Sequence, residues 1–180
     1  MTYEEIRARA VNGDVVGVKG TGVFSKVIQV MTKEEYSHVA MFVWHGTGLW
    51  LYEFVEGRGY QCTPSSQWFE IRSKQKIFFG KAPVTVRGKP DEVLRASSSF
   101  RYGGNLIKRY GVLSLVKVWF AQIIKKDIPT HQKVCSTFIQ FVWEACGFDL
   151  KQTADPGDIM RISTYYGDLV EFVPDLAGQS

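Results

Sequence analysis

Short apolar runs in the first half of the chain alternate with polar residues, as they do in strands of a half-buried sheet. Runs rich in β-branched and aromatic residues cover residues 14–19, 37–45, 49–56, 59–63 and 76–80. The link His45-Gly-Thr-Gly48 between two of these runs is typical of a β-hairpin connection. The pattern therefore predicts an antiparallel sheet built from the first half of the sequence.

Helices are indicated by start signals and by apolar residues at helical spacing. Thr2 followed by Glu5 fits a capping box, which predicts a first helix that ends near Gly13. Pro90 opens another helix, since proline lacks an amide that the first turn would leave unpaired. Further helices are predicted at residues 23–31, 112–126 and 134–145. Residues 155–158 predict a turn, and the segment after it is of undetermined type. The predicted class is α+β, with helices packed on the sheet.

The composition fits one domain over residues 1–180, with 45% hydrophobic and 22% charged residues. The longest strongly apolar stretch, residues 112–124, is shorter than the roughly 18 residues that span a bilayer. The acidic N-terminus lacks the features of a secretory signal. We therefore expect a protein that is cytoplasmic as synthesised, with delivery by a particle or by injection left open. Three cysteines without close spacing predict reduced thiols rather than a disulfide framework.

Charge is distributed unevenly behind a net charge of +4. Residues 72–133 carry 14 basic and 3 acidic side chains, whereas residues 1–71 and residues 134–180 are net acidic. A segment this basic can attract an anionic polymer or a membrane surface, or it can simply be a solvated face. We expect no specific nucleic-acid partner.

Cys135 is the thiol best suited to chemistry because it lies at the predicted start of a helix. Unpaired amides and the positive end of the helix dipole lower the pKa of a thiol there, and the same amides can stabilise an oxyanion. The alternative is that Cys135 packs in the interior, as we expect for Cys62 and Cys146.

A reactive thiolate needs a base, and the chain contains three histidines. His38 lies at the start of a predicted strand, where the sheet can hold its ring rigidly. We expect His45, in or beside the hairpin turn, and His131, four residues before Cys135, to be solvated. His131 and Cys135 lack the second ligand pair of a zinc site. We expect no metal and no cofactor.

Glu53 is the best candidate for a group that orients the histidine. It lies in an apolar strand, where an ionised side chain is costly unless it is paired. Counting back through the hairpin places Glu53 opposite residues 40–42, within reach of His38. The alternative is an edge strand in which Glu53 faces water. Together these residues predict a Cys-His-Glu constellation.

The order of these residues in the chain, together with several short motifs, resembles a known family. The motifs are Gly13-Asp-Val-Val16, Ser25-Lys-Val-Ile-Gln29, Tyr36-Ser-His-Val-Ala40, Tyr52-Glu-Phe-Val-Glu-Gly57, Thr63-Pro-Ser-Ser-Gln-Trp68 and Val134-Cys-Ser-Thr-Phe-Ile-Gln-Phe-Val142. They resemble the YiiX-like, circularly permuted branch of the papain-like NlpC cysteine amidases, which is related to lecithin:retinol acyltransferase. The resemblance covers about residues 13–148 and leaves residues 149–180 as a C-terminal extension.

The resemblance implies a permuted papain-like (NlpC-type) fold, in which the sheet that bears the histidine precedes the helix that bears the cysteine. It makes Cys135 the nucleophile, His38 the base and Glu53 the orienting acid, and it places Tyr36 in the substrate pocket. One departure is Thr137, where many relatives have an acid, so the substrate preference of those relatives is not carried over.

The leading hypothesis is a thiol-dependent hydrolase that cleaves an amide bond in a cell-wall peptide or an N-acyl or lipid amide. The expected partners are therefore peptide, peptidoglycan or acyl-amine substrates. An acyltransferase or a lipid deacylase would use the same residues. A non-catalytic binding or structural module on the same fold is the alternative from another class.

Overall fold

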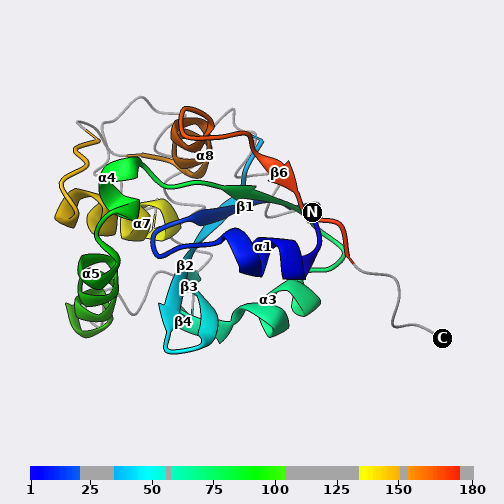
Figure 1. Cartoon of the computed structure of the whole chain (residues 1–180), viewed down its shortest axis with the longest axis horizontal. Helices are drawn as coiled ribbons and strands as arrows, with labels where there is room; N and C mark the ends of the chain where they lie inside the picture. The colour runs from blue at the N-terminus through cyan, green and yellow to red at the C-terminus, as the bar shows by residue number, and fades with distance from the viewer. Residues whose placement is uncertain (21–34, 56–57, 104–133, 151–153, 175–180) are drawn as a thin grey trace, which may run out of the picture.

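The structure, a computed structural model, describes residues 1–20, 35–55, 58–103, 134–150 and 154–174 of the chain. The predicted helices at residues 23–31 and 112–126 and the histidine at position 131 lie outside these ranges. The predicted α+β class with an antiparallel sheet is confirmed (Figure 1).

Six strands form one sheet in the order β4-β3-β2-β1-β5-β6, and every neighbouring pair is antiparallel. The strands are β1 (Val15–Lys19), β2 (His38–His45), β3 (Gly48–Val55), β4 (Gly59–Pro64), β5 (Lys76–Gly80) and β6 (Val170–Glu171). The predicted hairpin joins β2 to β3 through a turn at Gly46, whose φ is +56°. This left-handed conformation is one that glycine adopts without a steric penalty.

The helices are α1 (Tyr3–Arg9), α3 (Ser65–Ile71), α4 (Val84–Arg87), α5 (Pro90–Gly103), α7 (Val134–Ala145) and α8 (Pro156–Thr164). Thr2 and Glu5 form the predicted capping box of α1. After the end of α7, Gly147 has a φ of +89°, which is the left-handed conformation common after a helix.

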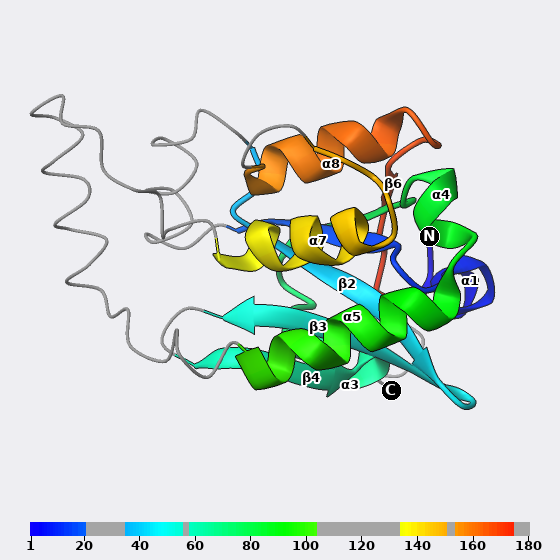
Figure 2. The same ribbon diagram turned by 90° about the vertical axis from the view of Figure 1, so that its left-hand side faces the viewer.

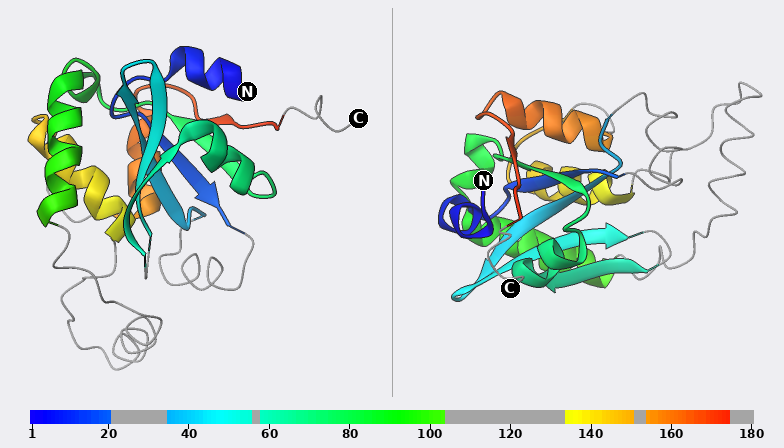
Figure 3. Two further views of the ribbon diagram at one scale, coloured as in Figure 1. Left: turned by 90° about the horizontal axis from the view of Figure 1, so that it is seen from below. Right: turned by 90° about the vertical axis from the view of Figure 1, so that its right-hand side faces the viewer.

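Alternate residues of the central strand β2 enter two separate cores. Val39, Met41 and Val43 pack with α4, α5, α7 and α8, whereas Ala40 and Phe42 pack with α1 and α3. Figures 2 and 3 show these two groups of helices on opposite sides of the sheet. Period-two alternation therefore sorts the side chains between the two faces.

The end of the chain differs from the predicted turn. Asp155 caps helix α8 through a capping box with Asp158, and Pro156 occupies the first turn. Helix α8 packs against β1 at Gly17, where an added Cβ would lie 2.6 Å from the Met160 sulfur. Asp, Pro and Gly occur both in turns and at helix starts, which is why the residue types alone favoured the turn.

Two arginines of the basic segment 72–133 pair with buried carboxylates inside the fold. Arg72 contacts Glu53, and Arg87 contacts Asp14. Part of the positive charge of this segment is thus used within the fold rather than on its surface. Within the parts of the chain that the structure describes, no helix is both long enough and apolar enough to cross a bilayer.

Candidate active site

His38 is held at the first position of β2, in the middle of the sheet. Its backbone pairs with Val18 of β1. The preceding residue, Ser37, donates its N–H to the Val18 carbonyl at 3.0 Å, and its hydroxyl oxygen accepts the N–H of Gly20. These bonds fix the chain just before the ring, so His38 is presented by rigid backbone, as the sequence predicted.

Glu53 lies on β3 beside His38. The strands pair Met41 with Tyr52, and one step further this register places Glu53 opposite Ala40, inside the predicted range. The Glu53 side chain is only 4% exposed, and its Oε2 lies 2.6 Å from Nε2 of His38. The alternative in which Glu53 faces water is therefore wrong.

Cys135 is the second residue of α7 and is partly buried against the core between α7 and the sheet. Burial raises the pKa of the thiol. The hydrogen bond and charge of His38, with further bonds from the backbone amides of Val39 and Ser136, outweigh that effect and lower the pKa of Cys135 overall.

His38 is the link between the other two side chains. Burial lowers its pKa, but hydrogen bonds to Cys135 and Glu53 and their negative charges raise the pKa of His38 to about 9. Because Nε2 faces Glu53, the other ring nitrogen, Nδ1, is left for the sulfur. A thiol with a lowered pKa beside a histidine with a raised pKa favours a thiolate-imidazolium pair at neutral pH.

Arg72 and Trp68, for which the sequence predicted no role at the site, complete the surroundings of Glu53. Arg72 donates from Nη2 to both carboxylate oxygens, at 3.0 and 3.1 Å. Burial raises the pKa of Glu53, but the hydrogen bond and charge of His38, followed by the charge of Arg72, lower it overall. The sequence feature that could have predicted Arg72 is the free-energy cost of burying the Glu53 carboxylate, because a buried carboxylate is stabilised by a cation as well as by a histidine.

Tyr36 is buried against the sheet two residues before His38. Its ring packs edge-on against Phe78 at 5.8 Å between centroids, and the ammonium of Lys19 lies 5.1 Å from the ring centroid. Burial, and to a smaller extent the charge of Glu35, raise the pKa of Tyr36 to about 12. The predicted role of Tyr36 in a substrate pocket stays a prediction.

The other predicted chemistry-bearing residues lie apart from this site. His45 ends β2 and hydrogen-bonds to the Tyr52 hydroxyl near the hairpin. Cys146 is buried after α7, as predicted, whereas Cys62 is exposed on β4 rather than packed in the interior.

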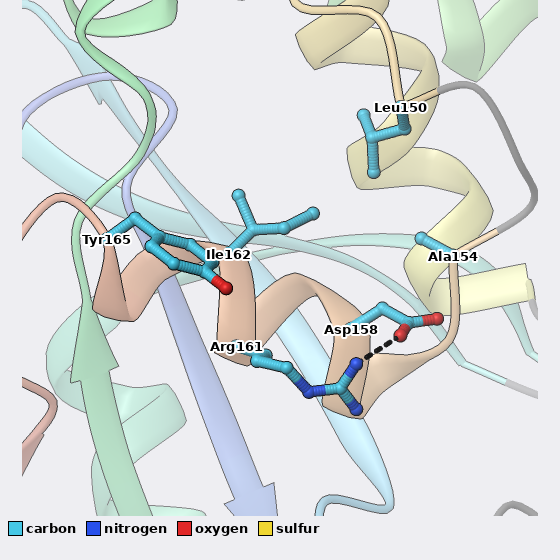
Figure 4. A pocket seen from close by; sticks show the side chains of 6 residues that line it. All are labelled: Leu150, Ala154, Asp158, Arg161, Ile162 and Tyr165. Atoms are coloured by element: carbon cyan, nitrogen blue, oxygen red, sulfur yellow. Dashed lines mark hydrogen bonds and ion pairs between the residues drawn. The ribbon is translucent and has the colours of Figure 1, made fainter.

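A separate pocket of about 200 Å³ lies against α8 (Figure 4). Leu150, Ala154 and four residues of α8 and its end line it, among them Arg161, which pairs with Asp158. Its lining includes neither the thiol nor the histidine of the candidate site.

No family model matches the sequence, and no curated protein matches it. Among solved structures, the fold is similar to the crystal structure of the metalloprotein YiiX from Escherichia coli O157:H7. The TM-score is 0.53, the identity is 16%, and the alignment covers 91% of this chain and 96% of the other. The likeness to YiiX that the motifs indicated is thus confirmed at the level of the fold.

The term metalloprotein belongs to that neighbour, and the residues of the present site do not fit a metal. Nε2 of His38 is already engaged by the Glu53 carboxylate at 2.6 Å. Across the described ranges, no cluster of three His, Cys, Asp or Glu side chains is arranged to hold an ion.

Proposed function

We propose that this chain is a cysteine hydrolase with a permuted papain-like (NlpC-type) fold, in which Cys135 attacks the carbonyl carbon of an amide. The observation that supports this proposal best is that His38, whose Nε2 lies 2.6 Å from the buried Glu53 carboxylate, also lowers the pKa of the Cys135 thiol at the start of α7. A thiol at a helix start, a histidine and an orienting acid together form the constellation of an activated nucleophile.

In this mechanism the Cys135 thiolate forms a bond to the carbonyl carbon, and the carbonyl π electrons move to oxygen. His38, protonated at Nδ1, donates that proton to the leaving amine as the carbon–nitrogen bond breaks, which leaves an acyl-enzyme. His38 then accepts a proton from water, which attacks the thioester and releases the acid and the thiolate. Glu53 stabilises the imidazolium and fixes the orientation of the ring throughout.

The substrate class proposed is a cell-wall peptide or an N-acyl or lipid amide, with Tyr36 contributing to the pocket. The basic composition of residues 72–133 favours an anionic polymer or a membrane surface as the setting. In the described part of that segment, Arg72 and Arg87 are paired with buried carboxylates. Exposed lysines such as Lys74 therefore supply the positive charge at the surface there.

The rates of turnover and of thiol alkylation test this proposal together. Cys135→Ala should abolish hydrolysis of a panel of wall peptides and N-acyl amides while the circular dichroism spectrum stays unchanged. Cys135 in the native chain should alkylate with a midpoint well below the ordinary ~8.5, and His38→Ala should raise it. His45→Ala, a histidine at the hairpin, is the matched control and should leave the midpoint unchanged.

The outcomes separate the rival functions. Product formation that requires an added amine or alcohol acceptor would indicate an acyltransferase, and release of fatty acid from a phospholipid would indicate a lipid deacylase. An ordinary thiol that is indifferent to His38 would contradict catalysis and favour a non-catalytic binding or structural module.

A further inference from the structure

The Glu53 carboxylate is also held by a residue other than His38 and Cys135. Arg72 directly follows α3, and one of its nitrogens contacts both Glu53 oxygens, at 3.0 and 3.1 Å. The Arg72 side chain is only 19% exposed. A carboxylate that accepts hydrogen bonds on both oxygens from one guanidinium has little freedom to rotate away.

Trp68 in turn fixes the arginine. The guanidinium carbon of Arg72 lies 4.2 Å from the centroid of the fully buried Trp68 ring. The indole N–H of Trp68 lies close enough to help lower the pKa of Glu53, although its geometry falls short of a hydrogen bond. Stacking on an aromatic face is a property of the planar guanidinium that lysine lacks.

These contacts cross the sheet from one layer of helices to the other. Cys135 packs in the core between the sheet and α7, whereas Trp68 belongs to the core on the opposite face with α3. The series of side-chain contacts therefore runs from Cys135 to His38, then to Glu53, and ends at Arg72. Arg72 therefore acts on Cys135 only through Glu53 and His38.

We propose that Arg72, stacked on Trp68, is a positioning residue that holds the Glu53 carboxylate in place beside His38 and offsets part of its negative charge. This inference rests on the proposed function for its kinetic consequence. The groups that face His38 are Cys135 from α7 and Glu53 from β3, and Arg72 contacts Glu53. The effect of Arg72 on the pKa of His38 can therefore be measured without a substrate.

The sign of the electrostatic effect distinguishes Arg72 from Glu53. Removing the positive charge in Arg72→Met makes protonation of His38 more favourable, so the pKa of His38 should rise. Removing the negative charge in Glu53→Gln should lower it. If Arg72 only supported the fold, there would be no reason for the pKa of His38 to shift in opposite directions in Arg72→Met and Glu53→Gln.

The experiment follows the His38 ring by NMR in histidine-labelled protein and measures turnover of the same samples. The variants are Arg72→Met, Arg72→Lys and Glu53→Gln. Arg95→Met is the matched control, because Arg95 is an exposed arginine on α5 that pairs with Glu92. We expect an upward shift of the His38 pKa for Arg72→Met, a downward shift for Glu53→Gln and no shift for Arg95→Met.

For turnover, Arg72→Met should lower kcat about tenfold to a hundredfold with KM unchanged, since a misplaced catalytic group costs rate and the contacts of Arg72 are to Glu53 and Trp68. Arg72→Lys retains the charge, so His38 should titrate as in the native chain while kcat is restored only in part. If Arg72→Met fails to fold, Arg72→Lys decides the question. A His38 pKa that moves in Arg72→Lys, or a full kcat in that variant, would overturn the proposal.

The two proposals fail in distinguishable ways. A native chain that hydrolyses no substrate and has an ordinary Cys135 thiol contradicts the hydrolase, while the NMR titration still tests Arg72. An active native chain whose His38 pKa and kcat are unchanged in Arg72→Met contradicts the role of Arg72 alone.

Discussion

Substitution of Asp14 by asparagine probes a buried ion pair that joins three parts of the fold. Asp14 is fully buried before β1 and accepts the backbone N–H groups of Val11 at 3.1 Å and Ala82 at 2.9 Å. Nε of Arg87 lies 3.1 Å from its Oδ1. Burial is the largest influence and raises the pKa of Asp14 to about 6, although the amides and Arg87 act in the opposite direction.

The magnitude of the pH effect follows from the difference in the pKa of Asp14 between the folded and unfolded states. The pKa rises from 3.8 to about 6 on folding, and a shift of roughly two units corresponds to about 3 kcal/mol. Because the folded state binds this proton more tightly, the stabilising contribution is fully present below pH 3.8 and is lost as the pH rises through about 6. Asparagine cannot titrate, so Asp14→Asn lacks this contribution at every pH.

Urea denaturation of both chains at about pH 4.5, 6.0 and 7.5, at constant ionic strength, measures the effect. The free energy of unfolding of the native chain relative to Asp14→Asn should decrease by about 2 kcal/mol from the lowest pH to the highest, because at pH 4.5 most but not all of the full contribution is present. Asp91→Asn, at an exposed acid on α5, is the control for removing a carboxylate that is not buried. A native advantage that grows with pH would refute the reasoning, since it would mean that the pairing with Arg87 outweighs the cost of burial.

Two further predictions concern the packing of the helices on the sheet. Trp143→Phe removes the hydrogen bond from the indole Nε1 to the Gly13 carbonyl at 3.1 Å, and it should destabilise the fold by about 1–3 kcal/mol in urea denaturation; an unchanged midpoint would show that this bond is dispensable. Gly17→Ala places a Cβ 2.6 Å from the Met160 sulfur and 2.8 Å from the Tyr36 ring, and should lower stability by about 1–3 kcal/mol. Thermal unfolding followed by circular dichroism measures this loss, and a stability equal to that of the native chain would argue against such close packing of α8 on β1.

The sequence was sufficient wherever the deciding interactions lie close together in the chain. The capping box of Thr2 and Glu5 and the hairpin of β2 and β3 follow from local residue types and from period-two alternation. Because hairpin register is set by the turn, the same reasoning brought Glu53 within reach of His38, and the structure has a hydrogen bond there. Strand periodicity and turn position thus predicted part of the candidate site.

Only the tertiary structure decided which distant groups neutralise the buried charges. Arg72 lies 19 residues after Glu53 and Arg87 lies 73 residues after Asp14, so no local pattern connects the partners of either pair. The helix that begins at Pro156 was likewise missed, because its first residues suit a turn equally well and the packing of Met160 on Gly17 favours the helix. Periodicity indicates which side of a helix or strand is apolar. It does not indicate which distant segment covers that side or pairs with its charges, because that pairing forms only when folding buries the two segments together, away from water.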